Sequence, residues 1–449
     1  MKKMFTSAQL RRLIVPLLIE QLLIMIVGMA DTIMVSVAGE AAISGISIVN
    51  DVNNLVIRLL AALAGGGAVI VSQYLGNKDM ENTKKSASQL VMISFLISSF
   101  LGLFCFVFHG QILHLLYGSV APDVMTNAKV YFWITALSFP FIGMYNSASA
   151  LYRSMNRTKV TMVVSILMNG INIIGNYICI YLLHMGAAGA AWPTLLSRVV
   201  AAIIMIALCT YAENPISINW PDVFSWKKGI VKKILSIAIP NGIENGLFQV
   251  GKIVISMIVA TYGTMQIAAN GVTNSLSVLC YATEEAVMLA VVTVVGQCVG
   301  AGEMDQARMY IRKLMKLAYG MAIVDNIFIF ILSPYALRMY TMTPETFQIA
   351  ETILGMECFA VAFLHAPSFV LPTCLRAAGD AKYTMYVGVA SMFLCRVFGA
   401  YLFGTVCGLG VVGTRIAMYL DWITRIIFFV LRYRSGKWTQ YRVVGESTC

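Results

Sequence analysis

Residues 13–38 read LIVPLLIEQLLIMIVGMADTIMVSVA, an apolar run of 26 positions with only two charged side chains, Glu20 and Asp31. A helix needs about 20 mostly apolar residues to cross the hydrocarbon core of a bilayer. This run is long enough to span a membrane. It predicts that the chain is an integral membrane protein.

Similar apolar runs recur along all 449 residues, of which 59% are hydrophobic and 12% are charged. Soluble domains carry about a quarter charged residues, so a water-soluble fold is not expected. The runs are long and unbroken, which favours helices over the short alternating strands of a membrane barrel. Twelve helices are predicted, over 13–38, 43–72, 86–108, 123–148, 160–182, 188–211, 234–260, 266–296, 314–333, 347–372, 383–404 and 411–432.

The sequence aligns with itself when it is shifted by 224 positions, which brings Pro16 onto Pro240 and Glu20 onto Glu244. Further pairs at this offset, or at 223, are Asn50 with Asn274, Gln73 with Gln297, Gly186 with Gly410, Gly189 with Gly413, Arg153 with Arg376 and Lys159 with Lys382. These pairs extend over nearly a whole half of the chain. We therefore infer an internal duplication.

The duplication predicts an all-α integral membrane protein with twelve transmembrane helices in two parallel six-helix repeats. Each repeat has an even number of helices, so both repeats enter the membrane from the same side. Residues 1–211 form the predicted N-terminal lobe and 234–432 the C-terminal lobe, with a polar linker at 212–233 and a tail at 433–449. In transporters of this architecture, the substrate site lies between the repeats.

The net charge of +11 comes from basic residues that are spread over the connecting segments and form no nucleic-acid-binding stripe. If the N-terminus is placed in the cytoplasm, Lys129 and Arg338 are the only basic residues of these segments that fall on the outer side of the membrane. The positive-inside rule then predicts a multi-pass cell-membrane protein with both termini in the cytoplasm. We expect the lipid bilayer and small organic molecules as its partners, no nucleic acid, and a monomer.

Asp31 is the strongest candidate for binding a coupling ion. It lies deep in the first predicted helix, with no basic residue within one turn. Burial there penalises the charged carboxylate, which suits the group to bind and release a proton. Asn169, Asn172 and Asn176 recur at spacings of three and four, which places their amides on one face of the fifth predicted helix. Such amides can also join neighbouring helices, and both interpretations remain open.

Glu20 and Glu244 are further candidates for ion coupling. Each follows a proline by four residues, so each repeat would carry a bent first helix with an acid one turn further along. A charge on a spanning helix costs about 2.5–3.5 kcal/mol at the bilayer centre, so a structural ion pair is the alternative role. For the substrate cavity we nominate Asp51, Asn54 and Gln249.

Histidine and cysteine provide no recognisable metal site or catalytic site. All ten cysteines except Cys449 lie in the apolar runs or within three residues of their ends, without a Cys-x-x-Cys pair, and the four histidines form no cluster. We interpret these cysteines as packing thiols and expect no cofactor. An intramembrane enzyme would need a nucleophile and a base, or metal ligands, that converge in the bilayer, so we do not expect an enzyme.

Several motifs together resemble one transporter family along essentially the whole chain. They are Pro16, the Ala30-Asp31-Thr32 step, Gln73-Tyr74-Leu75-Gly76, the segment from Arg153 to Lys159, Leu375 to Lys382, and Gly186 to Ala191. The sequence is similar to the multidrug and toxic compound extrusion (MATE) transporters. This resemblance implies export of organic, often cationic and amphipathic compounds in exchange for H⁺ or Na⁺, by alternating access between two lobes.

The resemblance also implies roles for individual residues. In the branch with an acid in the first helix, that acid forms a cation-binding centre with polar residues of the fifth helix, which match Asp31 and Asn172. Asn176 stands where that branch often has a second Asp, so the choice between H⁺ and Na⁺ stays open. Another branch uses a Glu near Gln249, for which Glu244 is the substitute candidate here.

A lipid-linked oligosaccharide flippase of the same superfamily is the alternative function. Such a protein would be expected to line its cavity with several arginines that bind pyrophosphate. The predicted helices contain few basic residues, and most of these lie near acids or helix ends. The sequence therefore favours the exporter.

Overall fold

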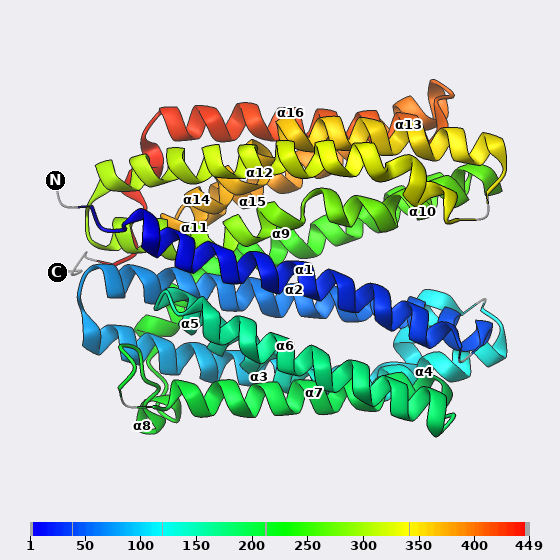
Figure 1. The fold of residues 1–449 in the computed structure, drawn as a ribbon. Helices are drawn as coiled ribbons and strands as arrows, with labels where there is room; N and C mark the ends of the chain where they lie inside the picture. Colours follow the sequence, from blue (N-terminus) through cyan, green and yellow to red (C-terminus); the bar gives the residue numbers. More distant parts are fainter. Residues whose placement is uncertain (1–2, 38, 119, 212, 341, 445–449) are drawn as a thin grey trace. The chain divides into compact units, whose positions relative to one another are not determined.

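The computed structural model describes residues 3–37, 39–118, 120–211, 213–340 and 342–444. This part of the chain is almost entirely helical and contains no strand (Figure 1). Residue 212 of the predicted linker lies outside the described residues. So do residues 445–449 of the predicted tail, with Cys449.

The first repeat forms six rods, two of which consist of two consecutive helices. Its helices are α1 (Ser7–Ser36), α2 (Glu40–Gly76), α3 (Met80–Tyr117), α4 (Pro122–Ala136), α5 (Phe139–Ser154), α6 (Thr158–Asn176), the π-helix η1 (Tyr177–Leu182) and α7 (Gly186–Cys209). The rods that contain two helices are α4 with α5 and α6 with η1. The short helix α8 (Trp220–Val223) lies in the connection to the second repeat.

The second repeat also forms six rods, with more interruptions. Its helices are α9 (Lys228–Ala260), α10 (Thr264–Cys280), α11 (Ala282–Gly300), α12 (Met304–Arg338), α13 (Pro344–Ala360), the π-helix η2 (Val361–Val370), α14 (Leu371–Ala377), α15 (Ala381–Ser391), the π-helices η3 (Met392–Val397) and η4 (Ala400–Val406), and α16 (Gly410–Arg434). A 3₁₀ turn, η5 (Lys437–Gln440), follows.

Ten helical segments of the described chain are long and apolar enough to cross a membrane. The remaining two predicted crossings are the rod of α4 and α5, which is interrupted near Ser138, and α16, which contains Arg415, Asp421 and Arg425. The prediction of twelve helices in two six-helix repeats is thus confirmed. The predicted bounds are less accurate. For example, α12 begins at Met304 and not at 314, because its first turns are helical but polar.

The duplication is visible in the backbone as well as in the sequence. Helix α1 ends at Ser36 and α9 ends at Ala260, which is the same offset of 224 that relates the sequences. The left-handed turns follow the same register. Five described positions of the first repeat have positive φ, and each aligns with a positive-φ glycine of the second repeat: Gly39 with Gly263, Lys78 with Gly302, Asn156 with Gly379, His184 with Gly408 and Gly186 with Gly410. Both repeats therefore turn at the same places.

The chain separates into two compact units, one formed by residues 7–242 and the other by residues 1–6 and 243–449. We call these the first and the second unit. The boundary falls inside α9, just after Pro240, so the first turns of α9 belong to the first unit. There, the side-chain amide of Asn241 donates a hydrogen bond of 3.2 Å to the carbonyl oxygen of Ala62 on α2.

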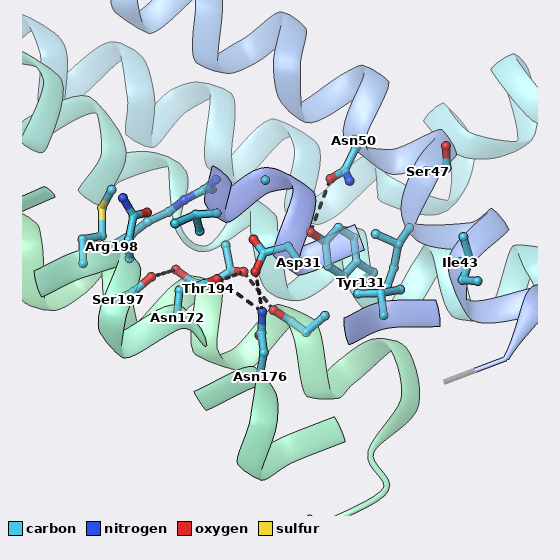
Figure 2. Close-up of a pocket in the computed structure, with 17 residues that line it drawn as sticks. Asp31, Ile43, Ser47, Asn50, Tyr131, Asn172, Asn176, Thr194, Ser197 and Arg198 are labelled. Atoms are coloured by element: carbon cyan, nitrogen blue, oxygen red, sulfur yellow. Dashed lines mark hydrogen bonds between the residues drawn. The ribbon is translucent and has the colours of Figure 1, made fainter. Parts of the chain in front are cut away.

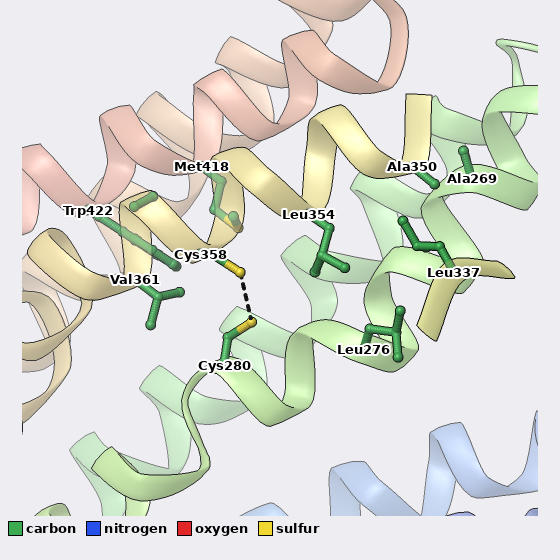
Figure 3. Close-up of a cluster of buried hydrophobic side chains, with 11 residues drawn as sticks. Ala269, Leu276, Cys280, Leu337, Ala350, Leu354, Cys358, Val361, Met418 and Trp422 are labelled. Atoms are coloured by element: carbon green, nitrogen blue, oxygen red, sulfur yellow. Dashed lines mark hydrogen bonds between the residues drawn. The ribbon is translucent and has the colours of Figure 1, made fainter. Parts of the chain in front are cut away.

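The second unit has an apolar core at the meeting point of α10, α13 and α16 (Figure 3). Its buried members are Ala269, Leu276, Cys280, Leu337, Ala350, Leu354, Cys358, Ala360, Val361, Met418 and Trp422. The sulfur atoms of Cys280 and Cys358 face each other at 4.0 Å, and both thiols are free. This placement agrees with the interpretation of these two cysteines as packing residues.

The first described residues dock on α12 in the second unit. The backbone N–H of Phe5 donates to the hydroxyl of Tyr310 at 2.8 Å, and that hydroxyl donates to the carbonyl oxygen of Phe5 at 2.7 Å. Their rings meet edge to face at 5.6 Å, and the N–H of Met4 donates to Gln306 at 2.8 Å. We call these four residues the N-terminal clasp. It joins the start of the chain to a helix formed some 300 residues later.

Candidate functional site

A cavity of about 360 Å³ lies among α1, α2, α4, α6 and α7 in the first unit (Figure 2). Its walls combine apolar side chains with an unusual number of polar ones for the interior of a membrane protein. It is lined by Val27, Gly28, Asp31, Val35, Ile43, Ile46, Ser47, Asn50, Tyr131, Met168, Asn169, Asn172, Asn176, Ala190, Thr194, Ser197 and Arg198.

Asp31 meets the polar face of α6 in this cavity. The side-chain amide of Asn176 donates a hydrogen bond of 2.9 Å to Oδ1 of Asp31. Figure 2 shows both side chains pointing toward one another from α1 and α6. The predicted amide face is therefore present, since Asn169, Asn172 and Asn176 all line the same cavity.

The amide of Asn172 can form a hydrogen bond with Asp31 whether that carboxyl group is ionised or protonated. One of its two terminal atoms, the nitrogen or the oxygen, lies 2.9 Å from Oδ1 of Asp31. With its nitrogen in that place, Asn172 donates to an ionised carboxylate, and its oxygen accepts from the hydroxyl of Thr194 at 3.1 Å. In the opposite orientation, its nitrogen donates to Thr194 at 3.1 Å, and its oxygen faces Asp31. The oxygen can then accept a hydrogen bond from a protonated carboxyl group.

The local chain geometry brings α6 and α7 close together at this site. A Cβ atom at Gly175 would lie 2.6 Å from Cβ of Pro193, so only glycine permits this approach without displacement. The approach brings Thr194 next to Asn172. Immediately after Asn176, the helix widens into the π-helix η1, and such widened turns occur often at functional sites.

Arg198 supplies the basic group of the cavity. One of its nitrogen atoms donates to the hydroxyl of Ser138 at 2.7 Å, and its positive charge attracts the carboxylate of Asp31. On the opposite wall, the hydroxyl of Tyr131 donates to the side-chain oxygen of Asn50 at 3.3 Å. One sequence pattern pointed to Asn50, its alignment with Asn274 in the second repeat. No sequence pattern pointed to Tyr131.

Glu20 and Glu244 lie outside this cavity, in equivalent surroundings in the two repeats. Glu244 forms an ion pair of 2.9 Å with Arg376 in the second unit. In the first unit, Glu20 accepts a hydrogen bond of 3.0 Å from Thr161 and is attracted by the charge of Arg153. In each repeat the acid thus lies near an arginine, and the sequence repeat aligns these two arginines with each other as it does the two acids. This is the arrangement expected of a structural contact that was duplicated with the chain.

The residues nominated for the substrate cavity do not line this cavity either. Asp51 and Asn54 are exposed on α2, and the hydroxyl of Tyr117 approaches Asp51 at 3.4 Å. Gln249 is half-buried on α9 in the second unit. Their neighbour Asn50 does line the cavity.

Three other intramembrane acids, all in the second unit, have basic partners. Arg415 lies 3.4 Å from Glu357, and Arg425 lies 2.9 Å from Asp421. Buried Glu284 pairs with His365, which sequence analysis did not assign to any cluster. Asp31 differs from these acids because its hydrogen-bonding partners, Asn176 and Asn172, are neutral amides.

Comparison with known protein families extends over both repeats. The family described as MatE matches residues 16–178 and again residues 240–402. These two segments are related by the same offset of 224 positions that relates the helices. The match therefore falls separately on each half of the duplicated chain.

Curated relatives match over nearly their whole length. An uncharacterized transporter, YisQ of Bacillus subtilis, is 28% identical and covers 95% of this chain and 93% of its own. A probable multidrug resistance protein, NorM of Thermotoga maritima, is 25% identical, with coverage of 97% and 94%. A solved outward-facing multidrug resistance MATE family transporter superposes with a TM-score of 0.89 at 19% identity, covering 98% of this chain and 99% of its own.

Proposed function

We propose, from the premise that the chain belongs to the MatE family of membrane transporters, that it exports organic compounds in exchange for H⁺ or Na⁺. The compounds would be amphipathic and often cationic, and export would proceed by alternating access. Relatives that are named as multidrug resistance proteins support export of this class of compound. We further propose that the protein lies in the cell membrane as a monomer with both termini in the cytoplasm.

One observation carries the proposed ion coupling: Asp31, on a helix long and apolar enough to cross a membrane, lines a cavity and has amides as hydrogen-bonding partners. When ionised, the carboxylate accepts from Asn176 and from the nitrogen of Asn172. When protonated, it donates to the oxygen of Asn172 once that amide has turned. Neither state leaves the half-buried carboxyl group without a partner, whereas a fully buried group without one would cost about 1–3 kcal/mol.

Sodium is an equally suitable coupling ion for these oxygen atoms. The side-chain oxygen of Asn176 is buried and makes no hydrogen bond with any described residue. Hard cations take carboxylate and amide oxygens as ligands. Asp31 and Asn176 together would supply such ligands, while H⁺ would need Asp31 alone.

The exposed face of α2 supports a route for polar or charged substrates. Asp51, Asn54 and Arg58 are exposed and recur at spacings of three and four, so they share one face of the helix. Ionisable groups on spanning helices face water-filled cavities or partners and avoid lipid. We propose that this face of α2 borders the substrate route.

The flippase alternative receives less support. It calls for arginines that are available to bind pyrophosphate. In the second unit, Arg415 and Arg425 pair with acids, and Arg396 lies 3.9 Å from Asp421. Each of these three arginines thus lies near an acid of its own unit, with Asp421 shared between Arg396 and Arg425.

The test is ion flux in proteoliposomes that contain the purified protein and a dye sensitive to either pH or Na⁺. Addition of a lipophilic cation such as ethidium should drive outward movement of one of the two ions, with Asp31→Asn as the inactive control. If no member of a broad panel of organic cations moves either ion, the exporter proposal is wrong. Translocation of a lipid-linked oligosaccharide by the same vesicles would then establish the flippase.

A further inference from the structure

The first four turns of α12 present basic side chains along one exposed face. This basic face consists of Arg308, Arg312, Lys313 and Lys316, which surround a surface hollow of about 510 Å³ together with Asp305 and Met309. All four bases are exposed, whereas Tyr310, Ile311 and Leu314 on the opposite face are buried. The basic face is therefore open to whatever surrounds the protein.

The first repeat shows what normally covers this face. At the offset of 224 positions, Arg312 and Lys313 align with Ser88 and Gln89 on α3, both of which are fully buried. The linker between the repeats lies over them, with α8 beside α3 (Figure 1).

Hydrogen bonds hold the linker on α3. The amide of Gln89 donates to the carbonyl oxygens of Asp222 at 2.6 Å and Ser225 at 2.7 Å, and it accepts from the N–H of Lys227 at 2.9 Å. The hydroxyl of Ser88 accepts from the N–H of Asn219 at 3.0 Å. Neutral polar residues thus occupy the face that a protein segment covers.

No described segment covers the equivalent face of α12. The chain that follows the second repeat takes another course: Trp438 stacks on Tyr433 at the end of α16, and Arg442 donates to the carbonyl oxygen of Gly300. The face has also changed in chemistry, because bases replace serine and glutamine. Its occupant should therefore carry negative charge.

The same side of α12 becomes apolar further along the helix. Val324, Ile327 and Ile331 recur there at spacings of three and four, and Ile327 is 56% exposed. One helix face thus carries basic side chains first and apolar side chains after them. This order matches a lipid molecule, which has a polar headgroup followed by acyl chains. The only acid at the hollow, Asp305, lies 3.5 Å from Arg308, while no described ion pair involves Arg312 or Lys316.

We propose that the basic face of α12 binds the phosphate headgroup of an anionic phospholipid, whose acyl chains lie along the apolar side chains that follow. Basic sites at the ends of membrane helices bind anionic lipids in this way. The lipid would take the position that the linker has on α3. This inference does not depend on the transported substrate or on the coupling ion.

The test is native mass spectrometry of the full-length protein with phosphatidylglycerol or phosphatidylcholine of identical acyl chains. The variant is Arg312→Gln/Lys316→Gln. The matched control is Lys228→Gln/Lys232→Gln, which also removes two exposed bases one turn apart, from the start of α9. Unchanged thermal unfolding in phosphatidylcholine would show that both variants are folded.

The wild-type protein and the control should retain phosphatidylglycerol in preference to phosphatidylcholine. The Arg312→Gln/Lys316→Gln variant should bind it about 25-fold more weakly, because each base contributes about fivefold to the affinity for an anionic lipid. An equal loss in the control, or equal retention of the two lipids, would overturn the proposal. Displacement of the lipid by inorganic phosphate would instead identify a site for free anions and would overturn the lipid assignment.

Discussion

Asn176 and Asp31 lie 145 positions apart in the sequence and are joined by a hydrogen bond of 2.9 Å between their side chains. This contact connects the first and fifth rods of the first repeat at the wall of the cavity. The carboxyl group of Asp31 is therefore bonded directly to α6. If Asp31 is protonated, the side-chain oxygen of Asn172 can accept a hydrogen bond from it once that amide has turned.

We predict that Asp31→Asn abolishes ion-coupled export. The substitution keeps the size of the side chain but removes the group that changes charge. Cells that produce the variant should accumulate a lipophilic cation as cells without the transporter do, although the variant should insert in normal amount. Asn172→Ala should reduce transport less, because the carboxyl group remains. Normal ion-driven efflux by Asp31→Asn would place the coupling site elsewhere.

The ion pair of Glu244 with Arg376 leads to a prediction about stability. Glu244→Gln leaves the partly buried Arg376 without its counter-charge and should destabilise the protein by about 3 kcal/mol. The double variant Glu244→Gln/Arg376→Gln should recover part of this loss, as measured by thermal unfolding in detergent. A Glu244→Gln protein of normal stability that fails to export would instead mark Glu244 as a coupling residue.

Adjacent glycines of α2 provide a matched pair of variants. A Cβ atom at Gly66 would lie 2.7 Å from backbone atoms of Ala238, whereas one at Gly65 would come no closer than 3.8 Å to Asn241. Gly66→Ala should therefore destabilise the first unit by about 1–3 kcal/mol through overpacking. Gly65→Ala should leave stability unchanged or raise it by up to about 1 kcal/mol, because alanine favours the helix. Equal thermal unfolding of the two variants would refute the close contact of α2 with α9.

Labelling of introduced cysteines tests the orientation in the membrane. In a background without native cysteines, Lys228→Cys at the start of α9 should react with a membrane-impermeant maleimide only after the cells are opened. Glu345→Cys at the start of α13 should react in intact cells. Both positions are exposed. Labelling in the reverse order would invert the predicted topology.

Patterns within a single helix allowed much of this site to be predicted. The spacing of Asn169, Asn172 and Asn176 places three amides on one face, and all three line the cavity. The proximity of Asp31 to these amides was implied by the family resemblance. Contacts between distant helices have no comparable signal. Tyr131 and Arg198 enter the cavity because α4 packs against α2 and α7, and α7 packs against α6. This packing depends on the complementary shapes of whole helices.

The duplication gave reliable information about architecture and partial information about contacts. It aligned Glu20 with Glu244 and Arg153 with Arg376, but it could not show that each acid lies near its arginine. Apolar content likewise placed the helices but not their ends. The polar first turns of α12 are helical, so that helix begins ten residues before its apolar run. Backbone hydrogen bonding continues into the polar region, where hydropathy carries no signal.

The N-terminal clasp sets an order of events during biosynthesis. Phe5 leaves the ribosome well before Tyr310, its partner, which lies 305 positions later. At about 5 to 20 residues per second, the two are made on the order of 15 to 60 s apart. Until then the apolar ring of Phe5 has no partner on α12. The clasp can therefore form only after the start of α12 has been synthesised, and a chain stalled before that point should leave Met4 and Phe5 open to proteolysis.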